Sequence, residues 1–335
     1  MNPMFSRTLK ALCVVMAAAL LSACGGASST VDPFIATRVI AFGDGFNQVD
    51  AYGSGVSTVR ASDLAVPTYV TDDTIAGRIA TRYGIVVKGV AGVAAGGPSL
   101  AATGGFSYAT ANARVADVDA QITAFLNAAG SVSKKDLIVI AVGNWDIYDA
   151  TLSGATSMDT VTTALVASIQ RLTNAGAERI VVMPPINMAR TPWATAYVTA
   201  NSGTTRSMIQ NLSNSANTSF NFTLLAKLTA TYRQDAKPVV FLDRTTDFNS
   251  FAGSVDASGN AIQNYSGIGF TNLSTAVCNS PTNYAGCDLN GLAAGVGSTA
   301  YQTSVFADNI NLTPVVNRYF GDRMLASMVS MGWAP

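Results

Sequence analysis

From residue 37 onward, short apolar runs rich in β-branched residues alternate with stretches of helical spacing. Each run has the length and composition of a strand that is buried on both faces. Strands that alternate with helices form a mostly parallel sheet covered on both faces, with ligands expected at the carboxyl ends of the strands. The sequence therefore predicts an α/β fold of three layers, α/β/α. The predicted strands are RVIAF (38–42), IVVKGV (85–90), LIVIAVG (137–143), RIVVMPP (179–185) and PVVFLD (238–243).

The stretches between these runs carry apolar residues every three or four positions, which indicates amphipathic helices. Gly84, Gly130 and Gly176 follow three of them, where a C-terminal cap is expected. For the last helix, Thr313 is the expected N-cap and Pro314 the first helical residue. The predicted inward-facing positions are Ile75, Ile79, Tyr83; Val118, Ile122, Phe125, Ala129; Val161, Leu165, Ile169, Leu172; and Val316, Phe320, Met324, Met328.

Composition excludes some classes of protein. With 335 residues, 49% of them hydrophobic and 12% charged, the chain can bury a substantial core, so disorder is not expected. Lys plus Arg and Asp plus Glu number 20 each. Because there is no basic field to collect phosphates, we expect no nucleic-acid partner.

The N-terminus has the pattern of a targeting segment. Arg7 and Lys10 precede the apolar run ALCVVMAAALL (11–21), which is too short to span a bilayer and is followed by LSAC (21–24). That tetrapeptide resembles the lipobox of bacterial lipoproteins, in which the cysteine is lipidated and becomes the first mature residue. An ordinary signal peptide cleaved near Ala23 is the alternative.

The lipoprotein interpretation predicts three parts: a signal peptide (1–23), a lipid-anchored tether (24–36) and one domain (37–335). Gly25 follows the cysteine, and in such lipoproteins a residue other than aspartate there implies sorting to the outer membrane. We therefore expect a bacterial envelope protein, attached to the membrane through Cys24.

The cysteine count agrees with this interpretation. After cleavage Cys24, Cys278 and Cys287 remain, and lipidation of Cys24 leaves an even pair. Cys278 and Cys287 lie nine positions apart in a polar segment, so we predict a disulfide between them in an oxidising compartment. A zinc site needs further ligands, and the chain contains no histidine.

Four segments resemble the conserved blocks of the GDSL, or SGNH, hydrolases. FGDGFNQVDAYG (42–53) resembles the first block, GGFSYATANAR (104–114) the second, VGNWD (142–146) the third and FADNINLTP (306–314) the last. The order and spacing match throughout. RIVVMPPINMARTP and FNFTLLAKLTA are also similar to connecting segments of the secreted branch of that family. The resemblance covers residues 36–332 and implies a flavodoxin-like sheet.

The resemblance also implies ester hydrolysis, yet the catalytic positions are substituted. In the family a serine attacks the ester, a histidine takes its proton, an aspartate orients the histidine, and glycine and asparagine groups bind the oxyanion. Carried over by position, the aspartate is Asp308. The serine falls on Gly45, the glycine on Ala111, the asparagine on Trp145 and the histidine on Asn311. A register shift of one place brings Asn144 into the asparagine role instead.

These substitutions predict an inactive member of the family. Gly45 has no nucleophile, and the Asn311 amide cannot act as a base near neutral pH. We therefore expect a ligand-binding or envelope-associated pseudoenzyme, with an ester hydrolase that uses a different nucleophile as the alternative. A third possibility is an accessory protein that docks on another envelope protein through the vacant cleft.

The expected cleft contains Asp44, Asn144 and Asp146 beside Asp308. Its aspartates are candidates for binding a hard cation, although such residues more often cap loops. The sequence has no dinucleotide or P-loop motif, so we expect no cofactor. Trp145 suggests a stacking cleft for an acyl chain or a glycan.

Overall fold

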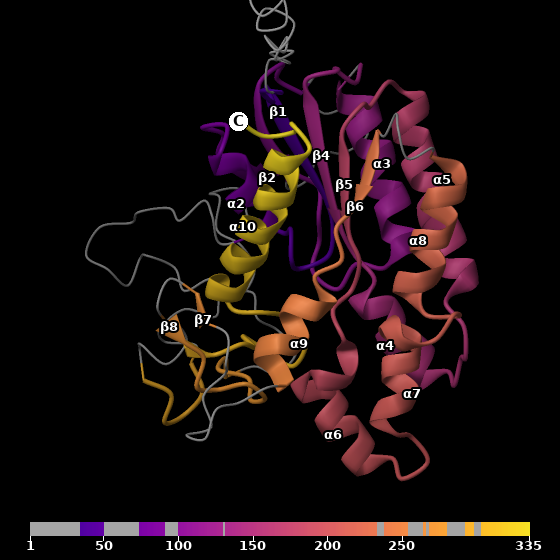
Figure 1. The fold of residues 1–335 in the computed structure, drawn as a ribbon, viewed down its shortest axis with the longest axis vertical. Helices are drawn as coiled ribbons and strands as arrows, with labels where there is room; N and C mark the ends of the chain where they lie inside the picture. The colour runs from indigo at the N-terminus through magenta and orange to yellow at the C-terminus, as the bar shows by residue number, and fades with distance from the viewer. Residues whose placement is uncertain are drawn as a thin grey trace, which may run out of the picture. The chain divides into compact units, whose positions relative to one another are not determined.

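The computed structural model of the chain describes residues 34–49, 74–90, 100–129, 131–232, 238–253, 264–265, 268–279, 292–297 and 303–335. A six-stranded sheet in the order β2-β3-β1-β4-β5-β6 lies at its centre, and every pair of neighbouring strands is parallel (Figure 1). This confirms the predicted α/β fold. The strands are β1 (Arg38–Gly43), β2 (Val87–Gly89), β3 (Gly104–Ser107), β4 (Asp136–Ala141), β5 (Ile180–Met183) and β6 (Val239–Phe241).

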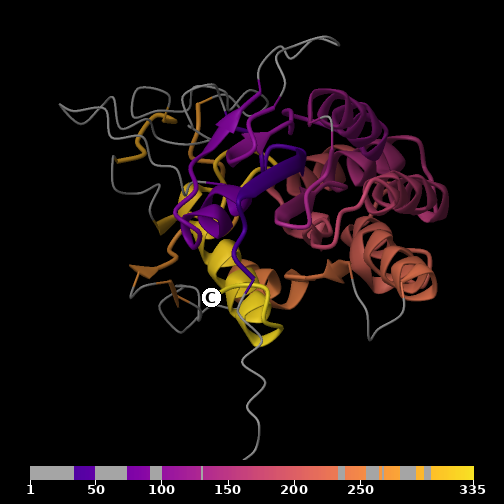
Figure 2. The ribbon, with the colours of Figure 1, turned by 90° about the horizontal axis from the view of Figure 1, so that it is seen from above.

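Helices cover both faces of the sheet. Helices α2 and α10 pack together on one face, and α3, α5 and α8 pack side by side on the other (Figure 2). The helices are α2 (Ile75–Thr81), α3 (Val115–Ala129), α4 (Asn144–Leu152), α5 (Asp159–Asn174), α6 (Pro192–Ala200), α7 (Arg206–Gln210), α8 (Phe220–Thr231), α9 (Thr245–Gly253) and α10 (Pro314–Ser330), with a 3₁₀ turn η2 (Met188–Arg190) and a π-helical turn η3 (Asn211–Ser215).

The local sequence explains where the covering helices begin and end. Thr74 caps α2 by accepting a hydrogen bond from Gly77 N at 3.0 Å. Thr313 is the N-cap of α10 and Pro314 its first residue, as predicted. Gly84 and Gly176 follow α2 and α5 with φ of 68° and 105°, the left-handed conformation that terminates a helix without steric cost in glycine. The predicted inward stripe of α10 is fully buried.

The central position of β1 fixes the geometry of the site. All six β1 residues are buried, and the strand pairs with β3 on one side and β4 on the other. At its start Arg38 forms a buried, bidentate ion pair with Asp136 of β4, with N–O distances of 2.7 and 2.6 Å. The opposite end of β1 therefore opens at the middle of the carboxyl edge of the sheet.

The segment 254–304, between α9 and the loop that leads to α10, is described only in part. It contains the antiparallel pair β7 (Asn264–Tyr265) and β8 (Ile268–Gly269). Its described end joins the loop before α10 through a parallel bridge between Asn272 and Ser304. Among the described helices, none has the length and apolarity needed to cross a membrane.

Candidate functional site

The turn that follows β1 is built as an elbow. Gly43 has a φ of 120°, and a Cβ at this position would lie 1.8 Å from the Ala141 carbonyl oxygen of β4. Only glycine allows this close approach of two backbones. Asp44 N then donates to the same Ala141 oxygen at 3.0 Å. Gly45, which the sequence motif predicts at the position of a nucleophile, lies buried in this turn and offers no side chain for chemistry.

A glutamine of α3 holds the elbow from the other side. Gln121 Oε1 accepts from Gly43 N at 2.8 Å, and Gln121 Nε2 donates to Gly43 O at 3.0 Å. Both backbone polar groups of the buried Gly43 are thus satisfied by one side chain. The sequence interpretation did not single out Gln121, because a lone glutamine on a helix carries no pattern that links it to a distant turn.

Asn144 connects the carboxyl ends of three strands. It follows β4 at the start of α4, and its Nδ2 donates to Asp44 Oδ2, after β1, at 3.1 Å. Its Oδ1 accepts from the backbone N–H of Ile186, after β5, at 3.2 Å. Asn144 is 1% exposed, so both ends of its amide are committed to protein partners. This geometry makes it a structural tie between the strands.

Two buried carboxyl groups lie beside this tie. Burial raises the pKa of Asp44 to about 7, although hydrogen bonds from Phe46 N and Asn144 Nδ2 lower it. Burial likewise raises the pKa of Asp146 to about 7, against the lowering effect of the Val115 N–H at the start of α3. Repulsion from Asp146 adds to the rise at Asp44. Desolvation is the dominant cause in both, so both sites favour the neutral acid more strongly than water does.

Trp145 begins a row of aromatic rings that runs from α4 to α6. The ring centroids of Trp145 and Tyr148 are 5.2 Å apart, and Tyr148 lies 4.8 Å from Trp193. Trp193 stacks on Tyr197 at 5.6 Å. The Arg114 guanidinium lies 5.3 Å from the centre of the Trp145 ring, within the range of cation–π attraction. Within the described residues, the buried indole Nε1–H of Trp145 has no hydrogen-bond partner.

The loop before α10 holds Asp308 and Asn311 in direct contact. Asn311 Nδ2 donates to Asp308 Oδ2 at 3.0 Å and to Oδ1 at 3.3 Å. Asp308 Oδ1 also accepts the backbone N–H groups of Ile310 and Asn311 at 2.7 and 2.6 Å. The side chains are 1% and 2% exposed, and burial raises the pKa of Asp308 to about 6.

The same loop is fixed to α6. Trp193 N donates to Asn309 O at 3.0 Å, so the Asp308–Asn311 pair lies next to the aromatic row. Ala111 lies half-buried in the turn that precedes α3. Its neighbour Asn112 has a φ of 59°, the left-handed conformation that asparagine tolerates better than most residues. The predicted site residues of the described chain thus all lie in turns and helix starts at the carboxyl edge.

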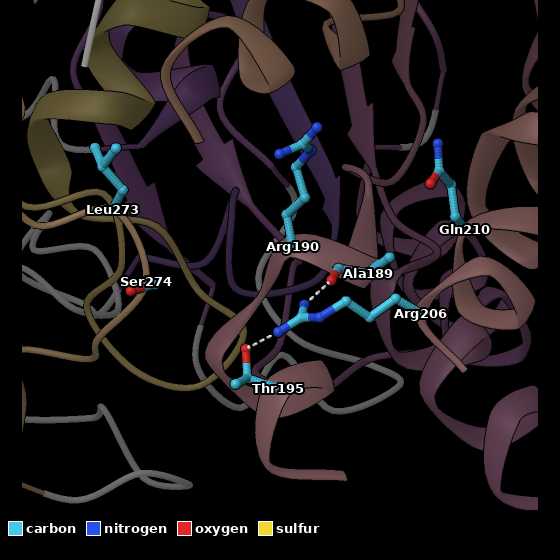
Figure 3. Close-up of a pocket in the computed structure, with 7 residues that line it drawn as sticks. All are labelled: Ala189, Arg190, Thr195, Arg206, Gln210, Leu273 and Ser274. Atoms are coloured by element: carbon cyan, nitrogen blue, oxygen red, sulfur yellow. Dashed lines mark hydrogen bonds between the residues drawn. The ribbon is translucent and has the colours of Figure 1, made fainter. Parts of the chain in front are cut away.

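A pocket of about 370 Å³ opens between η2, α6, α7 and the 273–274 segment. Arg206 reaches across it, donating to Ala189 O and, at 2.7 Å, to Thr195 Oγ1, while Arg190 points the other way (Figure 3). The sequence interpretation did not single out either arginine, because they come from different helices. The lining consists of Ala189, Arg190, Thr195, Arg206, Gln210, Leu273 and Ser274.

The predicted cysteine sites are only partly described. Cys278 is 5% exposed, and its backbone N–H donates to Ala307 O at 2.8 Å, directly beside Asp308. Cys287 and Cys24 lie outside the described residues, so the disulfide and the lipid anchor stay predictions. No cluster of three or more His, Cys, Asp or Glu side chains suited to a metal occurs in the described part of the chain.

Comparison with known proteins identifies the family. The sequence profile of the GDSL-like lipase/acylhydrolases matches residues 39–324, which is most of the domain. The chain belongs to the GDSL-like lipase/acylhydrolase family. A search of curated proteins finds no match. Among solved structures, this GDSL protein is similar to a catalytic mutant of an acetylxylan esterase from Geobacillus stearothermophilus, with 12% identity, a TM-score of 0.41, and coverage of 90% of this chain and 97% of the other.

Proposed function

We propose that this GDSL-family chain is a non-catalytic, lipid-anchored envelope protein that binds a ligand at the carboxyl edge of its sheet. The Asp308–Asn311 contact is the observation that carries the proposal. An imidazole held by this aspartate would relay a proton, whereas the Asn311 amide neither gains nor loses one near neutral pH. Asn311 therefore stabilises the buried carboxylate without supplying a base.

The nucleophile position supports the same conclusion. Gly45 is buried in the elbow and has no side chain. Loss of the serine or its base in a serine triad lowers kcat on the order of 10⁶-fold. The remaining polar groups of the edge, Asp44, Asn144 and Asp146, hydrogen-bond to one another or to backbone amides. They act as supports for the strand ends in this arrangement.

The chemistry of the edge favours a glycan with an anionic group over an acyl chain. Most residues that line the pocket beside α6 are polar, and two of them are arginines, which bind carboxylate and phosphate groups well. Tyr148 and Tyr197, in the neighbouring aromatic row, are half-buried and offer ring faces on which sugars stack. A site for acyl chains would need a longer apolar lining than Leu273 and Ala189 provide.

The deciding experiment combines an activity assay with a binding assay on the purified chain from residue 24 onward. We expect no hydrolysis of p-nitrophenyl acetate above the buffer rate and no labelling by a fluorophosphonate, because both need an activated serine. Steady turnover that survives purification, falls on substitution of one residue of the edge and labels one side chain would show an enzyme instead.

Binding is tested with oligosaccharides that do or do not carry carboxylate or phosphate groups, and with oleate. We expect the anionic oligosaccharides to bind. The Arg206→Gln substitution should lower their affinity about tenfold or more, since a charged hydrogen bond contributes roughly 1.5–3 kcal/mol. Arg171→Gln is the matched control, because Arg171 forms a surface ion pair with Asp119 on the helical face. Binding of oleate alone would refute the glycan assignment.

A further inference from the structure

The edge of the sheet opposite the site, here called the amino edge, is where the described chain enters the domain. Phe34 N donates to Gly332 O at 3.4 Å, which joins the entry point to the segment after α10. The Phe34 ring packs against Tyr83 with a centroid distance of 6.2 Å, and the Arg179 guanidinium lies 4.1 Å over its face. The entry point is therefore firmly attached to the domain.

Exposed apolar side chains gather around this entry point. Ile35 is 59% exposed and directly follows Phe34, and Met331 is 38% exposed and directly precedes Gly332. Val329 lies on the last turn of α10, and Val86 lies just before β2. These four are half of the large hydrophobic residues that are exposed in the described chain. Single exposed apolar residues are ordinary, but a group around one attachment point is not.

The same edge carries basic side chains. Lys134 and Lys135 lie in the turn before β4, and Arg179 lies just before β5. The Lys134 side chain is 82% exposed, and Lys135 is exposed as well. In these two described turns, Glu178 is the acidic group at the surface, and it pairs with Lys134 at 2.8 Å and with Arg179 at 3.7 Å. The surface keeps a positive excess next to its apolar residues.

The number of residues between the predicted anchor and the domain limits how far the amino edge can lie from the membrane. Cys24 precedes Phe34 by ten residues, and ten residues reach at most about 33–36 Å when fully extended. A lipid on Cys24 would therefore hold the amino edge near the bilayer. Apolar side chains with a few basic neighbours suit the interface of an anionic membrane, where each Lys or Arg contributes roughly 1 kcal/mol.

We propose that the amino edge rests on anionic phospholipid headgroups, so that the carboxyl edge with its ligand site points away from the membrane. This inference rests on the lipid anchor proposed above and adds the orientation of the domain. Helix α10 runs from one edge to the other, because it starts beside Asn311 and ends beside Phe34 (Figure 1). The two surfaces are therefore at opposite ends of the same domain.

The first test measures binding without the lipid. Residues 34–335 form one compact unit, so the chain from residue 24 with Cys24→Ser keeps the whole domain. We expect it to sediment with vesicles of phosphatidylethanolamine and phosphatidylglycerol, and to be released by salt. The Lys134→Gln/Lys135→Gln pair should lower the partition coefficient roughly tenfold or more, which follows from about fivefold for each basic residue.

The apolar contribution has a matched control. Ile35→Ser/Met331→Ser should also lower vesicle binding, whereas Leu152→Ser/Met208→Ser, which removes two exposed apolar side chains from α4 and α7 near the carboxyl edge, should leave it unchanged. Absence of vesicle binding by the parent chain would overturn the proposal. So would an equal loss of binding in the Ile35→Ser/Met331→Ser variant and in its Leu152→Ser/Met208→Ser control. These results do not depend on whether Cys24 is lipidated.

The second test measures orientation in the lipidated chain. Hydrogen–deuterium exchange on vesicles should slow in the segments 82–88, 131–136 and 329–335 of the amino edge, and stay unchanged in 188–197 and 306–312 of the carboxyl edge. Protection of the carboxyl edge would reverse the proposed orientation. If the chain carries no lipid but its amino edge still binds vesicles, the lipid anchor is refuted and the membrane contact of the amino edge stands.

Discussion

The side-chain amide of Asn311 donates to both carboxylate oxygens of Asp308, at 3.0 and 3.3 Å. In the proposed non-catalytic role, this contact holds the loop before α10 and supplies no group that accepts a proton near neutral pH. A buried carboxylate needs hydrogen-bond donors wherever it occurs, so an asparagine at position 311 is explained by stability. Asn311 meets that need with its side chain and its backbone N–H together.

Replacement of Asn311 by leucine should destabilise the domain by about 1–3 kcal/mol, because Asp308 loses a donor in a site that water does not reach. Urea unfolding followed by circular dichroism measures the change. Asn201→Leu serves as the control, since Asn201 is exposed at the end of α6. Equal stability of the Asn311→Leu variant and the parent would show that the contact contributes nothing.

Replacement of Asn144 by alanine should destabilise the domain by roughly 2–4 kcal/mol. The variant leaves a carboxyl oxygen of Asp44 and the N–H of Ile186 buried without partners, and each costs about 1–3 kcal/mol. Chemical unfolding is again the measurement, with Asn217→Ala at an exposed position as the control. A loss no larger than that of the control would contradict the role of Asn144 as a tie between strands.

Stability should fall as the pH rises from about 4 to about 7. Asp44 and Asp146 have folded-state pKa values of about 7 and Asp308 of about 6, all raised by burial above the value of 3.8 for an unperturbed aspartate. At pH values between the unfolded and folded pKa of each group, the folded state binds more protons than the unfolded state. The free energy of unfolding is therefore larger at the acidic end of this pH range. The melting temperature should be higher at pH 5 than at pH 8.

Asp44→Asn provides the control for this pH dependence. The asparagine side chain at position 44 carries no charge at any of these pH values. The melting temperature of the variant should therefore change less between pH 5 and pH 8 than that of the parent. A parent protein that melts at a higher temperature at pH 8 would contradict the raised pKa values.

The two glycines Gly43 and Gly84 should respond very differently to alanine. Both have positive φ, but a Cβ at Gly43 meets the Ala141 carbonyl oxygen at 1.8 Å, while a Cβ at Gly84 meets nothing within 4 Å. Gly84→Ala should cost about 1–2 kcal/mol from backbone strain alone. Gly43→Ala should cost more than about 4 kcal/mol or prevent folding, as judged by soluble yield and thermal unfolding.

Cys24→Ser should abolish incorporation of labelled palmitate and move the chain from the salt-resistant membrane fraction to the fraction released by a high-salt wash. The expectation follows from the lipobox and from the odd cysteine count that remains after cleavage. Cys13→Ser is a suitable control, because it removes a cysteine of the apolar run that precedes the lipobox. Unchanged labelling and unchanged fractionation would support cleavage near Ala23 by an ordinary signal peptidase.

The sequence predicts five of the six strands of the central sheet and misses one. The five apolar runs coincide with β1, β2, β4, β5 and β6, because strands buried on both faces leave a dense apolar pattern. Strand β3 escaped notice, since Gly104 and Gly105 make up half of its four residues and carry no apolar side chain. Gly105 is required there, because a Cβ would lie 2.6 Å from Val86 O of the neighbouring chain segment.

The candidate site is predictable only where a family motif marks it. The positions of Gly45, Asp308 and Asn311 follow from the motif, whereas the partners that hold them do not. Gln121 acts on a turn 78 residues away, and Asn144 bonds to residues 100 and 42 positions away. Such contacts depend on the tertiary fold, and one sequence contains no periodic pattern that reveals them.

The clamp of Gln121 on Gly43 separates folding from chemistry at the elbow. Because a neighbouring helix holds the peptide of Gly43, and Ala141 holds the N–H of Asp44, the bend does not rely on any side chain at position 45. A lineage could exchange a nucleophile for glycine there without dismantling the scaffold. The elbow therefore keeps its shape through backbone contacts, independently of any reactive group at position 45.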